Sequence, residues 1–221
     1  MKLRTIPLGL PLAMLAGCTS SIDIGPISPA TTTASSWVLF SSASPSPATS
    51  FANPPYETAS GTFLPYRPGS TAISYDPAVV PPGATATLTI TTSGYGTDVR
   101  LAVTGLIPNR AYGAHLHTNP CGADPEAAGG HYQNHRDPVT PSVNPVYANP
   151  VYANPENEVW LDFTASPTGT ATSTSSHGWD FSATAPPRAL VLHAEHTMTG
   201  AGVAGKAGAR VACLTLPASQ G

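Results

Sequence analysis

The residues best suited to chemistry are the histidines gathered between Tyr112 and His135. This stretch reads YGAHLHTNPCGADPEAAGGHYQNH and holds four of the seven histidines in the 221-residue chain. His115 and His117 are two residues apart, so on a β-strand both imidazoles would lie on one face, about 6.6 Å apart along the backbone. His131 follows a Gly-Gly pair that permits a close return of the chain. This spacing predicts a metal site.

A fourth histidine could reach the same place from far along the chain. His193 lies in the strand-like run ALVLHAEH, where it would share one strand face with Val191 and Glu195. A histidine that stands alone on a strand is usually just a partly exposed polar residue, so His193 becomes a candidate ligand only together with the others. His135 comes four residues after His131 and is the weaker candidate, with a solvent-exposed loop histidine as the alternative.

The composition indicates what kind of fold positions these histidines. Charged residues make up only 10% of the chain, whereas it contains 20 glycines and 25 prolines, which favours strands and turns over amphipathic helices. Short strand-like runs joined by turns predict an all-β antiparallel sandwich or barrel. No basic run suggests a nucleic-acid partner. The runs are residues 86–91, 99–104, 110–117, 158–165, 170–176, 188–196 and 208–216.

The N-terminal residues predict export. Lys2 and Arg4 precede about a dozen mostly apolar residues, which is typical of a secretory signal and too short for a membrane span. The sequence LAGC that ends at Cys18 resembles the bacterial lipobox. We therefore expect residues 1–17 to be a signal peptide and Cys18 to carry lipid that anchors the protein to a membrane, at the cell surface or in the periplasm. The alternative is an ordinary signal peptide followed by a stray cysteine.

The next segment has the composition of a linker. Residues 18–70 are rich in Ser, Thr, Ala and Pro, and we expect a flexible tether there, followed by one domain over residues 71–221. Two apolar patches interrupt the tether, SSWVLFSS and GTFLPYRP. Either patch could pack on the domain as an extra edge.

The cysteine count supports an oxidising compartment. If Cys18 carries lipid, Cys121 and Cys213 remain, and an even remainder outside the cytoplasm indicates one disulfide. That bond would close a long loop across the domain.

Four short motifs occur in the order typical of copper-zinc superoxide dismutases. GAHLHTNPC resembles the family's GFHVHE segment and the cysteine after it, AGGHYQ resembles AGGHF, and LVLHAE resembles LVVHE. AGARVACLTL resembles the closing G-x-R-x-A-C strand. The resemblance covers roughly residues 75–217 and rests on four separate motifs. It implies an eight-stranded Greek-key barrel and copper-dependent conversion of superoxide to O₂ and H₂O₂.

The resemblance also implies roles for individual residues. Arg210 matches the active-site arginine, whose fixed positive charge would attract and position a small anion. The alternative for Arg210 is an ordinary strand arginine in a surface salt bridge. The four copper ligands are matched by His115, His117, His131 and His193. Of these, His131 stands at the position that bridges copper to zinc. The family's disulfide is matched by Cys121 and Cys213.

Departures from the family pattern argue against zinc. The zinc ligands should follow His131 closely, but NPVYANPENEVW stands where that segment is expected, and the guide loop before Arg210 is short. Both features resemble the copper-only branch of the family, so we expect copper and no zinc. His131 then needs another partner for its second ring nitrogen. The candidates are Glu195, Asp137, Glu158 and His135.

Three functions are compatible with these patterns. The favoured one is an extracytoplasmic, lipid-anchored superoxide dismutase that uses copper. A surface copper-binding or copper-buffering lipoprotein without useful turnover would need the histidines but not Arg210. An adhesion domain with incidental histidines would bind no copper tightly. No feature of the sequence selects an oligomeric state.

Overall fold

The computed structural model describes residues 56–138 and 149–217, so the expected signal peptide, Cys18 and the patch SSWVLFSS lie outside the described part. No helix within these two ranges has the length and apolar character to cross a membrane. The described elements are the strands β1 (Tyr56–Thr62), β2 (Ala72–Ser74), β3 (Thr85–Thr92), β4 (Thr97–Thr104), β5 (Ala111–His117), β6 (Phe163–Thr164), β7 (Ala171–His177), β8 (Ala189–His193) and β9 (Arg210–Thr215), and the 3₁₀ helix η1 (Pro125–Ala128).

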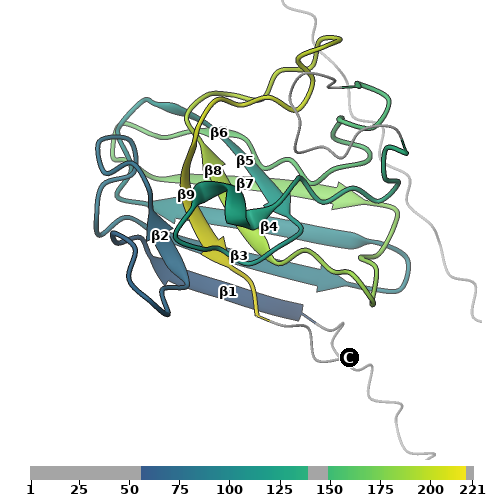
Figure 1. Cartoon of the computed structure of the whole chain (residues 1–221), viewed down its shortest axis with the longest axis horizontal. Helices are drawn as coiled ribbons and strands as arrows, with labels where there is room; N and C mark the ends of the chain where they lie inside the picture. Colours follow the sequence, from purple (N-terminus) through teal and green to yellow (C-terminus); the bar gives the residue numbers. More distant parts are fainter. Residues whose placement is uncertain (1–55, 139–148, 218–221) are drawn as a thin grey trace, which may run out of the picture. The chain divides into compact units, whose positions relative to one another are not determined.

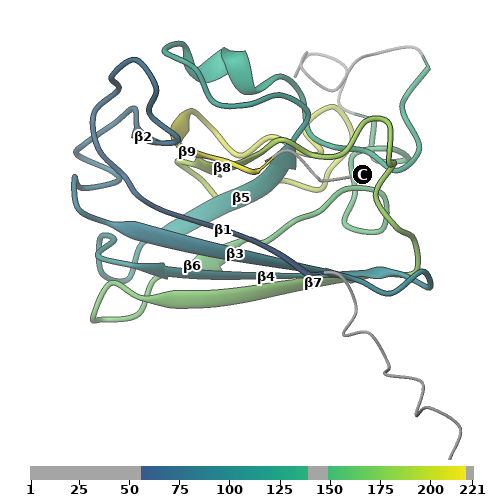
Figure 2. The same ribbon diagram turned by 90° about the horizontal axis from the view of Figure 1, so that it is seen from below.

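The strands form two antiparallel sheets. One has the order β1-β3-β4-β7 and the other β2-β9-β8-β5-β6, and Figure 2 shows them as two layers. Strand β4 pairs with β7, and β5 pairs with β8, which gives the crossovers of a Greek key. The all-β antiparallel prediction is confirmed.

Of the two predicted forms, sandwich and barrel, the structure is the sandwich. Each sheet is open, because the edge strands β1 and β7 of one sheet form no ladder with the other sheet in the described residues. The molecule is therefore a sandwich, and the three-residue β2 is an additional strand at the edge of the second sheet.

Alternating side chains explain how the sheets pack. In β4, Val99, Leu101 and Val103 are buried, whereas Asp98 and Arg100, which alternate with them, are exposed. This period of two directs one apolar face of each sheet into the space between the layers. The largest fully buried apolar side chains are Phe63, Ile73, Leu88, Leu101, Tyr112, Leu116, Leu161, Leu190, Leu192 and Leu214.

The folded domain begins earlier than residue 71. Strand β1 lies in the range expected to be tether, and all seven of its residues pair with β3. Phe63 directly after it is fully buried in the core. The patch GTFLPYRP thus packs on the domain as an edge, because Phe63 removes a large apolar surface from water that a tether would leave exposed. Figure 1 shows β1 along the lower side of the sandwich.

The run EVWLDFTA is less regular than a strand over residues 158–165. Its only ladder is β6, although isolated bridges link Trp160 to His115 and Glu158 to Gln133. At Ala114 the backbone N–H donates to the Asp162 side chain (3.0 Å) instead of to a backbone carbonyl. The side chains of this segment therefore take part in the site beside β5.

Candidate metal centre

Two of the candidate ligands lie on the outward face of β5. Leu116 and its neighbours at even spacing point into the core, so the intervening His115 and His117 face away from the other sheet. Both imidazoles are nevertheless fully buried, with 0% exposure, because loops cover this face. Strand β8 pairs with β5 and places His193 opposite Gly113 on the same side. The strand register thus gives His115 and His117 the shared face that was predicted and places His193 beside them.

A loop brings His131 back to β5. A bridge pairs the backbones of His117 and His131, and Thr118 N–H donates to Gly130 O (3.0 Å). Gly129 has φ +72°, and a Cβ there would lie 2.5 Å from Thr118 Oγ1. Only glycine fits at this position, which explains the first glycine of the Gly-Gly pair in the sequence.

The four histidines His115, His117, His131 and His193 form one group. Each offers a ring nitrogen, and these four atoms lie within 4.8 Å of one another. No other group of three or more His, Cys, Asp or Glu with this geometry occurs in residues 56–138 and 149–217. His131 is 9% exposed and His193 is 4% exposed, so the centre reaches solvent only on their side.

Oxygen atoms set the orientation of three of the rings. Nδ1 of His117 lies 3.0 Å from Gly129 O, Nδ1 of His193 lies 3.3 Å from Gly208 O, and Nδ1 of His131 lies 2.7 Å from Glu158 Oε2. Carbonyl and carboxylate oxygens only accept hydrogen bonds, so each of these rings carries its hydrogen on Nδ1. Nε2 is then the nitrogen that each ring can offer to a metal.

Among the four candidates, Glu158 is the partner of His131. Its side chain is fully buried and also accepts hydrogen bonds from Gln133 Nε2 (2.8 Å) and Trp160 Nε1 (2.7 Å). Three donors on one carboxylate compensate for its burial. Sequence reasoning missed Gln133 and Trp160. Gln133 comes two residues after His131, and Trp160 comes two residues after Glu158. In an extended segment, residues two apart lie on the same side, which is the signal that could have found them.

His115 makes its hydrogen bond through Nε2, whereas the other three rings use Nδ1. Its Nε2 lies 2.6 Å from Thr197 Oγ1 and 3.6 Å from Asp162 Oδ1. Its Nδ1 is buried and has no hydrogen-bond partner among the described residues. A buried polar atom without a partner is unfavourable unless something absent from the protein binds it. Sequence reasoning identified neither Thr197 nor Asp162.

The imidazoles of His115, His117 and His193 are neutral near pH 7. Burial lowers the pKa of His115 and His117 well below 6.5, and the neighbouring histidines and Arg210 lower the pKa of each further. Burial, with His131 nearby, lowers the pKa of His193 to about 3. Metal ligation requires neutral imidazole, so protons do not compete for these nitrogens at neutral pH.

These residues fit a copper ion. Imidazole is a good ligand for copper, though also for zinc, iron and nickel. The Nε2 atoms of His117 and His193 lie 3.4 Å apart, and with hydrogens on both Nδ1 atoms they face each other as lone pairs. A cation between them would relieve that repulsion and would also satisfy His115 Nδ1. The residues present therefore fit the metal that the resemblance implies.

Acid is expected to destabilise the metal-free protein. Because the pKa values of His115, His117 and His193 are lower in the folded state, the unfolded chain binds more protons once the pH falls below about 6.5. Stability should be greatest above pH 6.5 and fall towards pH 3, by up to about 1.4 kcal/mol per pH unit for each imidazole. Urea unfolding at pH 7.5 and 5.5 measures this. An equal midpoint at both pH values would contradict the assigned protonation.

Arg210 lies beside the histidines on β9. It is the cross-strand partner of His193, and its side chain is 10% exposed. Nη1 donates to Pro125 O (3.1 Å), and Nη2 lies 3.2 Å from Glu126 Oε2, so both contacts come from η1. Burial lowers the pKa of Arg210, but guanidinium remains charged at neutral pH. A positive charge is thus held next to the centre.

The predicted disulfide is present. Cys121 and Cys213 are bonded across 92 residues of sequence. The bond ties β9 to the loop that contains η1, and Tyr75 Oη also donates to Gly122 O (2.8 Å) in that loop. The loop that contacts Arg210 is therefore held from two sides.

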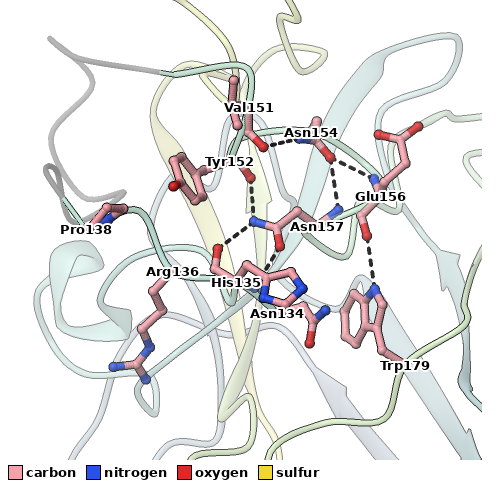
Figure 3. Close-up of a pocket in the computed structure, with 10 residues that line it drawn as sticks. All are labelled: Asn134, His135, Arg136, Pro138, Val151, Tyr152, Asn154, Glu156, Asn157 and Trp179. Carbon is pink, nitrogen blue, oxygen red and sulfur yellow. Dashed lines mark hydrogen bonds between the residues drawn. The ribbon is translucent and has the colours of Figure 1, made fainter.

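His135 does not join the four-histidine group. Its side chain is exposed and lines a separate open cavity of about 810 Å³, which Figure 3 shows beside the turn of residues 151–157. Asn157 Nδ2 fixes the backbone there by donating to His135 O and Tyr152 O (2.8 Å each). The other two histidines also lie outside the group: the His177 ring lies 4.2 Å from the Trp179 ring, and His196 is exposed.

Comparisons with known proteins gave matches only among solved structures. No family model matches the chain, and no curated protein matches it. The structural neighbours are Cu/Zn superoxide dismutase and SOD-like proteins. The Cu/Zn superoxide dismutase from Brucella abortus is 20% identical, and the match covers 74% of this chain and 100% of that chain with a TM-score of 0.47. A double mutant and a single mutant of a SOD-like protein from Bacillus subtilis are 20% and 18% identical, each covering 59% of this chain and 88% of that chain with a TM-score of 0.43.

Proposed function

We propose that this protein is a copper-dependent superoxide dismutase. The observation that carries the proposal is the buried group of four imidazoles with Arg210 as the cross-strand neighbour of His193. Superoxide is a small anion, and a fixed guanidinium beside a redox metal is what its capture requires. Two superoxide ions and two protons would give O₂ and H₂O₂.

The protein's own residues would hold the metal and receive the anion. Copper, when bound, supplies one-electron redox chemistry. His115 through Nδ1 and the other three histidines through Nε2 would hold it, and the surrounding oxygens keep each ring in that orientation. Arg210 would attract and orient superoxide on the side where the metal centre reaches solvent, which is the side of His131 and His193.

We propose that copper binds without a companion zinc. His131 stands where the family bridges two metals, but here its Nδ1 is bonded to buried Glu158 at 2.7 Å. A carboxylate in this place can orient the ring without a second metal. Metal analysis of the purified protein tests the proposal: we expect one copper and no zinc per chain, and stoichiometric zinc would contradict it.

Arg210→Ala is expected to slow superoxide turnover while leaving copper affinity within about twofold. Local positive charge raises encounter rates of anions by about 10- to 1,000-fold, so a loss of about tenfold or more in turnover is expected. Stopped-flow superoxide decay and a competitive copper titration measure the two quantities. Arg100→Ala removes an exposed arginine on β4 and is the matched control, expected to have no effect. Equal turnover in the Arg210 and Arg100 variants would contradict the role of Arg210.

A second candidate is a copper-binding protein without turnover. The observation that favours it is the pair between Arg210 and Glu126, because that carboxylate already occupies one side of the guanidinium. Glu126 is 67% exposed, so the pair is screened and superoxide could displace it. A protein that binds one copper but whose superoxide decay is unaffected by Arg210→Ala would be of this second kind.

We propose an extracytoplasmic location. The bond between Cys121 and Cys213 fits an oxidising compartment. Attachment to a membrane through lipid on Cys18 remains part of the proposal. Mass spectrometry of the mature N-terminus would test it, since a lipidated first residue at position 18 is expected, and an unmodified N-terminus elsewhere would contradict it.

A further inference from the structure

His115 differs from the other three histidines in what fixes its tautomer. The others donate to oxygens that can only accept, so their tautomers follow directly. His115 Nε2 instead meets the hydroxyl of Thr197, at 2.6 Å. A hydroxyl can donate or accept, so this contact alone leaves the tautomer of His115 undetermined.

Asp162 determines the direction of that bond. Thr197 Oγ1 donates to Asp162 Oδ1 (2.8 Å), and the Thr197 backbone N–H donates to Oδ2 (2.7 Å). An ionised carboxylate only accepts, so the single hydroxyl hydrogen of Thr197 is used on Asp162. The Thr197 oxygen must then accept from His115, which places the imidazole hydrogen on Nε2.

The carboxylate is itself held in place. Asp162 Oδ1 also accepts from Ala114 N–H (3.0 Å) on β5, and Oδ2 lies 3.0 Å from His196 Nδ1. The side chain is 11% exposed, so water has little access to it. Thr197 can approach β5 because Gly113 has no side chain: a Cβ there would lie 3.2 Å from Thr197 Oγ1 and 2.6 Å from Ala207 Cβ.

The consequence lies at the other nitrogen of His115. With the hydrogen on Nε2, Nδ1 carries a lone pair, and this is the buried atom without a partner in the described residues. The other tautomer would direct a hydrogen into the place where a metal must lie.

We propose that Thr197, oriented by Asp162, is the positioning residue that holds His115 as the Nε2–H tautomer and so presents Nδ1 to copper. The proposal rests on the proposed function only where copper is concerned. The tautomer of His115 can be measured on the metal-free chain and does not depend on any activity.

The test compares Thr197→Val, which keeps the shape of threonine without its hydroxyl, with Thr197→Ser, which keeps the hydroxyl. Long-range ¹H–¹⁵N NMR spectra of the metal-free full-length chain report the tautomer of each imidazole. We expect His115 as Nε2–H in the parent and in Thr197→Ser, and a shift toward Nδ1–H in Thr197→Val. Should the valine variant not fold, Thr197→Ala removes the hydroxyl with a smaller change in packing. A parent His115 with its hydrogen on Nδ1, or a tautomer unchanged without the hydroxyl, overturns the proposal.

Copper affinity provides a second measurement. Partners of ligating histidines are worth about 10- to 100-fold in metal affinity, so Thr197→Val should bind copper that much more weakly, and Thr197→Ser within about threefold of the parent. Equal affinity in the valine variant and the parent overturns the proposal. If the parent binds copper but consumes no superoxide, while the tautomer and affinity change as expected, the proposed function fails and the role of Thr197 is supported.

Discussion

Copper binding is expected to be lost when His117 is replaced by alanine. His117 is fully buried, and its ring nitrogen belongs to the four that lie within 4.8 Å of one another. Outer partners of metal ligands already contribute about 10- to 100-fold in affinity, so removing a ligand should weaken copper by more than about 100-fold. Competitive titration against a copper chelator measures this, and superoxide consumption should disappear with the metal.

His135→Ala is the matched control for that variant. It also removes one imidazole from the same stretch of sequence, but this side chain is exposed and outside the four-histidine group. Copper affinity should stay within about twofold of the parent value. Equal losses in the two variants, or an unchanged affinity in His117→Ala, would contradict the assignment of the site.

Removing the disulfide is expected to have the largest effect on stability. The bond between Cys121 and Cys213 closes a loop with a sequence separation of 92. Chain entropy alone then predicts a loss of about 4 to 5 kcal/mol in the free energy of unfolding when both cysteines become alanine. Urea unfolding of the double variant Cys121→Ala/Cys213→Ala against the parent measures it. A loss below about 1 kcal/mol would contradict this expectation.

The same variant should also alter the surroundings of Arg210. Pro125 and Glu126, which contact its guanidinium, belong to the loop that the disulfide ties to β9. Without the bond, that loop has fewer constraints, so superoxide turnover should fall more than copper affinity does.

Much of the site could be predicted because strand geometry is local. The spacing of His115 and His117 requires a shared face whenever that segment is extended. The same argument places His193 on the same strand face as Val191. The position of Arg210 was anticipated from its resemblance to a motif, and the structure supplies the physical reason, which is its pairing with His193 across β8 and β9.

The partners of the ligands could not be predicted in the same way. Glu158 was one of four candidates for His131, because the choice depends on how the segment after residue 149 packs against β5. Thr197 and Asp162 are 35 residues apart in sequence and meet only through the folded loops. Likewise, the Ser, Thr, Ala and Pro content of residues 18–70 predicts a tether where β1 lies, because the order of β1 comes from its pairing with β3 and not from its own composition.

Superoxide decay in the presence of the copper-loaded full-length protein is the measurement that tests the central claim most directly. The four buried imidazoles and Arg210 predict that decay accelerates in proportion to bound copper and that a chelator which removes the copper abolishes the effect. Decay no faster with the copper-loaded protein than with the metal-free protein would contradict the claim that this site is that of a superoxide dismutase.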